Sequence, residues 1–486
     1  MKQNERRRAA VMLAALMASS SLMACGEADE TTADTTDAVQ TGAAETVETG
    51  ETELTDNLPE MDYEGYTFRF STRDPGWQHS LWLMEELTGD TMNDAIYNRN
   101  LAVAERFNIT YDEVSYMEPD EALKTLLAGE DAFDIVSTRT PTLLEFAEQG
   151  LLFQADDLPY VDLTKPWWNQ SLNECLTIAG TNYLFAGAYN VTAYDNTHML
   201  VFNKDMLTRF SLENPYTLVN EGDWTMDAFA EMISSVTVDV DGNGTMDEND
   251  SYGFLSQPKH VLPGLWIGAD ILTITKDEND IPRFSLPSDQ KFADVFEAAY
   301  AMTWDSGAWY VNEYIRNDDM TLITMFAEEH GLFMDATGYF IASLRDMDAD
   351  FGIIPYPKYN EEQNTYYSRI EGVNPSGVPV TAADVERTSV ILEAMAFESL
   401  GTVLPAYYEV SLKTKMVRDE ESSAMLDIIF ENHVLDLGDG VWFDLLRDGL
   451  FRDMFTTNNR NLASSLASVE NSVIEKLNNT VENLTK

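Results

Sequence analysis

The chain has 486 residues, more than one compact core usually serves, so we expect two large lobes. Its 84 acidic residues outnumber the 30 basic ones and give a formal net charge of -54, yet 44% of the residues are hydrophobic. A folded protein with this charge repels phosphate backbones and anionic lipid surfaces, which excludes nucleic acid as a partner. The charge favours neutral or cationic ligands and divalent metal ions.

The N-terminal segment has the pattern of a secretory signal. A cluster of three arginines precedes an apolar stretch over residues 9–23, which is shorter than the roughly 20 residues of a membrane-spanning helix. Residues 22–26 (LMACG) resemble a lipobox, which predicts that residues 1–24 are a signal peptide and that Cys25 is acylated, for example with palmitate. Two acyl chains would hold the protein on the extracellular face of a Gram-positive type of cell membrane.

Residues 25–60 are predicted to form a disordered acidic tether. Between Gly26 and Glu60 the chain has eleven acidic residues and no Lys or Arg. Such a composition cannot bury a core, and the repulsion between its charges keeps it extended. We therefore expect the folded body to begin near residue 61.

The first part of the body alternates strand and helix patterns. Strands are predicted over 66–72, from 108 and over 132–136, and helices over 91–107 and 120–127. This order indicates an α/β fold with a parallel sheet covered by helices. Because ligands bind beyond the carboxyl ends of such strands, the candidate ligand contacts are Arg73, Trp77, Ser137, Thr138 and Arg139.

The middle of the chain continues this alternation, and its end is mainly helical. Strands are predicted over 199–202, 331–334 and 351–354, and Thr225 is the expected N-cap of a helix that ends near residue 235. From residue 382 onward the pattern is mostly that of helices.

Residues 239–250 match the spacing of a calcium-binding loop. Position 6 of that loop is the required glycine, Gly244, and the predicted Ca²⁺ ligands are Asp239, Asp241, Asn243, Thr245, Asp247 and Asp250. A helix precedes the loop, but residues 251–255 have the pattern of a strand. This predicts a structural calcium site rather than a sensor that opens on binding, and a solvated acidic turn is the alternative.

Common catalytic signatures are absent from the sequence. There is no HExxH pair, no G-x-S-x-G elbow and no Walker loop, and the five histidines are expected to be mostly structural or surface residues. A glycosidase carboxylate pair stays open because acidic residues are so numerous. Among the nine tryptophans, Trp77 and Trp266 are the candidates for stacking on a sugar, whereas Trp167 and Trp168 are expected to form a packed corner.

Several stretches, taken in order, resemble the extracellular solute-binding lipoproteins of sugar ABC transporters, the family 1-like proteins related to maltodextrin-binding protein. They are residues 95–100 (AIYNRN), 160–169 (YVDLTKPWWN), 202–205 (FNKD), 222–227 (GDWTMD), the acidic loop with Tyr252-Gly253, 352–358 (GIIPYPK) and 405–408 (PAYY). The resemblance implies a periplasmic-binding-protein-like type II fold, with two α/β lobes joined by a hinge of several crossings. Lobe one would hold 61–192 plus 352–374, and lobe two 193–351 plus 375–486, with crossings near 190–196, 351 and 371–376.

The same resemblance implies further ligand contacts in a cleft between the lobes. Residues 137–139 would form the sugar-contacting loop of lobe one, and Asp335, Thr337 and Tyr339 would lie on the facing loop of lobe two. Tyr189 and Asn374 are further predicted ligand contacts. Tyr339 stands where relatives often carry a tryptophan.

The predicted function is that of a monomeric, non-enzymatic binding protein. It would capture an uncharged carbohydrate, such as an oligosaccharide, and deliver it to ABC permease subunits. The alternatives are a secreted calcium-dependent glycan-active enzyme and a cell-surface glycan adhesin.

Overall fold

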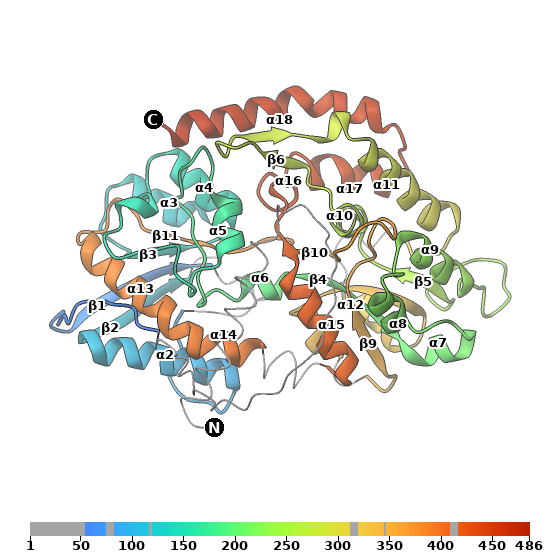
Figure 1. Cartoon of the computed structure of the whole chain (residues 1–486), viewed down its shortest axis with the longest axis horizontal. Helices are drawn as coiled ribbons and strands as arrows, with labels where there is room; N and C mark the ends of the chain where they lie inside the picture. Colours follow the sequence, from blue (N-terminus) through green and yellow to red (C-terminus); the bar gives the residue numbers. More distant parts are fainter. Residues whose placement is uncertain (1–53, 74–81, 116–118, 312–318, 345–346, 409–416) are drawn as a thin grey trace, which may run out of the picture.

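The structure is a computed structural model that describes residues 54–73, 82–115, 119–311, 319–344, 347–408 and 417–486. The predicted signal peptide, Cys25, most of the tether and Trp77 lie outside these residues. Two four-stranded sheets with helices packed around them form two lobes side by side (Figure 1). The predicted α/β class is confirmed.

The first lobe is built on a sheet with the strand order β11-β3-β1-β2. Strand β1 (Tyr66–Thr72) pairs in parallel with β2 (Ile109–Ser115) and β3 (Ile135–Ser137), and β11 (Ser376–Gly377) pairs antiparallel with β3. The helices of this lobe are α2 (Thr91–Phe107), α3 (Pro119–Leu127), α4 (Thr140–Glu148), α5 (Gln170–Leu176), α13 (Val385–Gly401) and α14 (Val403–Pro405).

Helix α2 forms where the spacing of apolar residues predicted a helix. The Asp90 carboxylate caps the helix by accepting the N–H groups of Met92 and Asn93, and the helix ends at Asn108, whose φ is 51°. One face of α2 buries an apolar stripe against the sheet and α13. The predicted helix over 91–107 is confirmed.

The second lobe is built on a sheet with the strand order β5-β8-β4-β9. Strand β4 (His198–Asn203) is antiparallel to β8 (Gly331–Thr337) and β9 (Phe351–Ile354), and β5 (Tyr252–Leu255) is parallel to β8. As predicted, Thr225 caps α9, and its hydroxyl oxygen accepts the Ala228 N–H at 3.3 Å. The main helices are α7 (Lys204–Phe210), α8 (Pro215–Glu221), α9 (Met226–Ser235), α10 (Pro258–Gly268), α11 (Gln290–Tyr300), α12 (Asp319–Ala327), α15 (Glu420–Glu431) and α17 (Arg452–Thr456).

Smaller elements complete the two lobes. Two further two-stranded ribbons are β6 (Ile274–Lys276) with β7 (Pro282–Phe284), and β10 (Ser368–Arg369) with β12 (His433–Val434). The short α-helices are α6 (Thr192–Asp195) and α16 (Leu437–Gly440). Short 3-10 helices span Ala155–Asp157, Leu286–Ser288 and Phe340–Leu344, and π-helical turns span Ala301–Asp305 and Arg447–Phe451.

The strand pairings divide the chain between the lobes differently from the predicted boundaries. Strand β9 pairs with β4, so residues 351–354 belong to the second sheet, although 352–374 was predicted to lie in lobe one. Strand β11 and helix α13, predicted in lobe two, pair with β3 and pack on α2. The chain therefore returns to the first lobe near 371–376, because β9 completes the second sheet before that crossing.

Helix α13 and the segment around Trp167 form a packed corner of the first lobe. Trp167 and Trp168 are 1% and 2% exposed, and both indole N–H groups donate to the carboxylate of Glu393 on α13, at 2.8 and 2.9 Å. The expected packed corner is confirmed. Residues 385–408 are the one described helical stretch long and apolar enough to cross a membrane, but most of it is buried, as in the core helix of a folded lobe.

The C-terminal helix α18 (Leu462–Leu484) lies along both lobes (Figure 1). Its apolar stripe packs on β7 and the turn at 286–288, and it also contacts α4 of the first lobe. Near its end, the Lys476 ammonium lies 2.9 Å from the Glu148 carboxylate, and the Tyr183 hydroxyl donates to the Leu484 carbonyl at 3.0 Å. The helix is therefore attached to both halves of the molecule.

Candidate functional site

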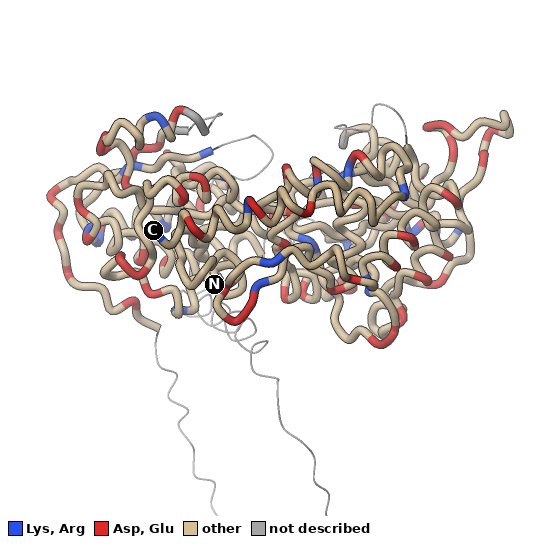
Figure 2. The backbone as a smooth tube through the Cα atoms, turned by 90° about the horizontal axis from the view of Figure 1, so that it is seen from above, with Lys and Arg blue, Asp and Glu red and all other residues tan. Residues whose placement is uncertain are grey.

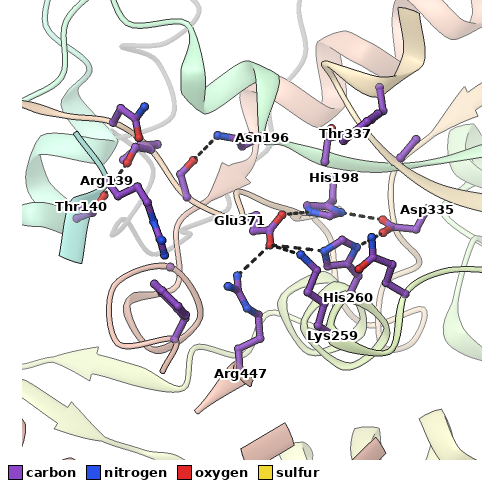
Figure 3. A pocket seen from close by; sticks show the side chains of 18 of the residues that line it. Arg139, Thr140, Asn196, His198, Lys259, His260, Asp335, Thr337, Glu371 and Arg447 are labelled. Atoms are coloured by element: carbon purple, nitrogen blue, oxygen red, sulfur yellow. Dashed lines mark hydrogen bonds and ion pairs between the residues drawn. The ribbon is translucent and has the colours of Figure 1, made fainter. Parts of the chain in front are cut away.

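A cavity of about 390 Å³ lies between the two lobes. Its walls come from the junction of β3 and α4, from the ends of β4 and β8, from the first turn of α10, and from the crossing at 371–374 (Figure 3). A ligand in this cavity would contact both lobes and the segment that joins them. The size falls at the lower end of the roughly 300–1,000 Å³ usual for small-molecule sites.

The topology of the second sheet brings three polar side chains to one edge. Because β5 and β8 are parallel, the carboxyl end of β8 and the start of α10, which follows β5, lie at the same edge. Strand β4 runs the other way, so its first residue, His198, lies opposite Thr337 at that edge. This arrangement places His198, His260 of α10 and Asp335 of β8 together.

Asp335 is the buried centre of this cluster. Its carboxylate accepts hydrogen bonds from Nδ1 of His198 at 2.9 Å, from Nδ1 of His260 at 3.0 Å and from the hydroxyl of Tyr356 at 2.7 Å. Burial would raise the pKa of Asp335, but the two imidazoles outweigh burial and hold the pKa well below its usual value. Asp335 is therefore ionised.

Glu371 is the second carboxylate of the cavity wall and is surrounded by cationic groups. Its Oε1 lies 3.3 Å from Nζ of Lys259, 3.2 Å from the Arg447 guanidinium and 3.5 Å from Nε2 of His260. Burial would raise the pKa of Glu371, but Lys259, His260 and Arg447 together hold it well below its usual value. Figure 3 shows these groups converging on the Glu371 carboxylate.

A fully buried ion pair supports this wall from behind. Arg369 donates to the Asp439 carboxylate at 2.6 and 3.0 Å, and neither side chain is exposed. A further guanidinium nitrogen of Arg369 lies 3.0 Å from Nε2 of His198. Two parallel hydrogen bonds between a guanidinium and a carboxylate fix the orientation of both side chains.

Five of the predicted ligand contacts line the cavity, namely Arg73, Arg139, Asp335, Thr337 and Asn374. Ser137 and Thr138, by contrast, are buried behind the wall, and the Ser137 hydroxyl donates to the Asn374 carbonyl at 3.2 Å. They position the crossing segment instead of facing a ligand.

The structure also places three predicted aromatic contacts away from the cavity wall. Trp266 is 1% exposed because α10 turns it into the core, where its indole N–H donates to Asp436 at 3.3 Å. Tyr189 is fully buried with its ring 4.9 Å from that of Trp82. Tyr339 precedes the lining residue Phe340 but does not line the cavity itself.

Sequence reasoning missed the residues that dominate the wall. His198 and His260 were expected to be ordinary histidines, and Lys259, Glu371 and Arg447 were not considered. A signal existed for His260, which stands in the first turn of a helix directly after a predicted strand. Glu371 and Arg447 belong to segments that approach the site only through the tertiary fold.

No family model matches the sequence, and no curated protein matches it. The fold, however, is that of the maltose-binding-like type II solute-binding proteins, with two α/β lobes and a cavity between them.

Among similar solved structures is an ABC substrate-binding protein from Listeria monocytogenes in complex with cycloalternan, with 11% identity, a TM-score of 0.55, and coverage of 85% of this chain and 99% of that one. A sugar transporter from Rhizobium etli in an open conformation has 14% identity, a TM-score of 0.57, and coverage of 87% and 99%. An ABC transporter solute-binding protein from Thermotoga lettingae bound with alpha-D-tagatose has 13% identity, a TM-score of 0.52, and coverage of 86% and 100%. At these identities the likeness establishes the fold.

Proposed function

We propose that this protein captures a carbohydrate in the cavity between its lobes and delivers it to an ABC permease. The observation that carries the proposal is a cavity of about 390 Å³ whose walls come from both lobes and combine polar with apolar side chains. Amide and hydroxyl groups of Asn196, Asn374 and Thr337 suit the hydroxyl groups of a sugar, and Phe340 suits its C–H faces. The similar structures that hold cycloalternan and tagatose have this same fold.

Capture would be coupled to closure of the lobes. A ligand that contacts both walls stabilises the arrangement in which the walls are close, and this closed form is the one that a permease can recognise. The chain would act as a monomer, because one chain supplies both walls of the cavity.

Calorimetry against a panel of glycans, combined with small-angle X-ray scattering, tests this proposal. We expect at least one glycan to bind with a 1:1 stoichiometry and to reduce the radius of gyration. Binding of a peptide or a lipid in the cavity, with no binding of any glycan, would contradict the carbohydrate assignment.

The protonation of the two wall carboxylates favours a binding protein over a glycan-active enzyme. Glycosidases commonly need one protonated carboxyl group as a general acid beside an ionised one. Here the pKa values of Asp335 and Glu371 are both lowered by their cationic neighbours, so neither is a proton donor. Release of reducing ends by the purified protein, abolished by Asp335→Asn, would support the enzyme instead.

The proposed location is the extracellular face of the cell membrane, through lipid on Cys25. The lipobox pattern at residues 22–26 supports this, and the acidic segment up to residue 60 would be the spacer. Mass spectrometry of the N-terminal peptide from membranes should show an acylated Cys25. Cys25→Ala should release the protein into the soluble fraction, and an unmodified, membrane-free wild-type protein would refute the anchor.

We further propose that the loop at 239–250 binds a structural Ca²⁺ ion. Carboxylate oxygens of Asp239, Asp241 and Asp250 lie within 4.8 Å of one another, and hard oxygen ligands are those that Ca²⁺ prefers. Gly242 and Gly244 adopt φ values of 69° and 82°, which lets the loop turn tightly around these groups. As expected, the loop runs from helix α9 into strand β5.

The proposed Ca²⁺ ion should affect the stability of the protein and not its affinity for a ligand. No residue of this loop is among the described residues that line the cavity, so chelation should lower the melting temperature while leaving glycan affinity unchanged. Asp241→Asn should weaken Ca²⁺ binding, with Glu278→Gln on another loop as the control. An unchanged melting temperature with and without Ca²⁺ would rule out a structural ion.

A further inference from the structure

The cavity wall has a charge opposite to that of the molecule. Figure 2 shows acidic residues spread over both lobes, in keeping with the net charge of -54. The residues that line the cavity nevertheless include four cationic side chains, Arg73, Arg139, Lys259 and Arg447, against two carboxylates, Asp335 and Glu371. The expectation of an uncharged cargo, which came from the net charge of the chain, therefore does not follow from the site.

Both carboxylates of the cavity wall already have hydrogen-bond or ion-pair partners within the protein. Asp335 accepts from two histidines and Tyr356, and Glu371 lies against Lys259 and Arg447. Arg447 is also met by Asp448, at 3.1 Å, and by Asp439, at 3.8 Å. These side chains form a neutralised block and leave little excess of negative charge to attract a cationic ligand.

Arg139 differs from the other lining cations. It is half-buried at the junction of β3 and α4, and no hydrogen bond or ion pair connects its guanidinium to any residue that the structure describes. Its guanidinium carbon lies over the ring of Phe443, 4.6 Å from the centroid. In Figure 3 the Arg139 side chain lies on the opposite side of Glu371 from His198 and Asp335.

The contact with Phe443 holds the Arg139 guanidinium in place without using its N–H groups for hydrogen bonds. Two N–H groups on one edge of a guanidinium match the two oxygens of a carboxylate. Partial burial makes an unpaired guanidinium costly, so a ligand that supplies two charge-assisted hydrogen bonds is favoured over one that does not.

We propose that the cavity takes an acidic saccharide, and that Arg139, held over Phe443, binds the carboxylate of a uronate unit. Asn196, Asn374 and Thr337 are then available to the hydroxyl groups of the same sugar. This inference rests on the proposed function and names its substrate class. A single unpaired guanidinium fits one singly charged, planar carboxylate better than a dianionic phosphate.

Calorimetry with matched pairs of ligands tests the inference. The probes are short oligosaccharides of galacturonate, glucuronate and mannuronate, each paired with its neutral counterpart, together with galactose 6-sulfate and galactose 6-phosphate. We expect a uronate to bind at least about tenfold more tightly than its neutral partner. Raising the salt concentration should weaken the uronate more than the neutral sugar.

Variants of Arg139 test whether its guanidinium is the group that binds the uronate carboxylate. Arg139→Gln should weaken uronate binding about 10- to 100-fold, and by a larger factor than it weakens binding of the neutral sugar, with Arg139→Lys in between. The control is Arg460→Gln, which removes the same charge from an exposed pair with Asp305. Denaturation curves confirm that each variant is folded.

The outcomes separate this inference from the proposed function. Neutral sugars that bind as tightly as uronates, with no effect of Arg139→Gln, overturn the inference and leave carbohydrate binding intact. Binding of the sulfate or phosphate sugar without the uronates overturns the assignment of a carboxylate. Absence of binding by every glycan overturns the proposed function itself.

Discussion

Glu393 should make the stability of the first lobe fall as the pH rises. Its carboxylate is 2% exposed and accepts the indole N–H groups of Trp167 and Trp168. Burial raises the pKa of Glu393 from 4.5 to about 7, and the two indole hydrogen bonds only partly oppose this shift. The folded protein therefore holds this proton more tightly than the unfolded chain does.

The size of the effect follows from the two pKa values. A carboxyl group whose pKa is raised on folding stabilises the protein at low pH, and this stability is lost as the pH rises from the unfolded value toward the folded one. With values of 4.5 and about 7, Glu393 alone should lower the free energy of unfolding by about 2.5 kcal/mol between pH 5 and pH 8.

Urea denaturation at pH 5, 6, 7 and 8, followed by tryptophan fluorescence, measures this change. Glu393→Gln cannot ionise, so its pH dependence should be flatter than that of the wild type by about 2.5 kcal/mol over this range. Glu386→Gln, an exposed position on the same helix, is the matched control and should follow the wild type. If the wild type and Glu393→Gln have the same pH dependence within about 0.5 kcal/mol, the argument from burial is wrong.

Two further substitutions, each with a companion variant, test the packing behind the site and beside the acidic loop at 239–250. Arg369→Met should destabilise the protein by about 3–5 kcal/mol in urea denaturation, because it leaves the Asp439 carboxylate buried without its main partner, and adding Asp439→Leu should restore part of the loss. A loss below about 1 kcal/mol would show that water reaches the pair. Gly253→Ala should cost about 1–3 kcal/mol, because a Cβ there would overlap the backbone of Ile233, whereas Gly372→Ala, with open space around its Cα, should cost less. Equal effects at the two glycines would contradict this description of the packing.

Local patterns were enough to predict most of the elements. The strand at 66–72, the helix at 91–107 and the cap at Thr225 all depend on residues that are neighbours in the sequence, and all are confirmed. The division between the lobes was wrong at 352–374 because it depends on which strand pairs with β4, and a fully buried strand such as β9 carries no local sign of its partner.

Two sources led to the predicted contacts that line the cavity. Arg73 and Arg139 were predicted because they follow strands β1 and β3, whereas Asp335, Thr337 and Asn374 were implied by the family resemblance. Trp266 was misplaced because the direction of a side chain on α10 is set by packing against Phe292 and Phe451, far along the chain. Glu371 could not be identified, because its partners come from three separate segments.

Helix α18 limits the ways in which the lobes can move. It packs on β7 and on α4, so it is held at two separate places. A stiff helix attached to both lobes resists any movement that changes the distance between its two attachments, so the easiest opening rotation has an axis that passes close to α18 and runs across it. The two lobes would then separate most on the side of the molecule farthest from α18.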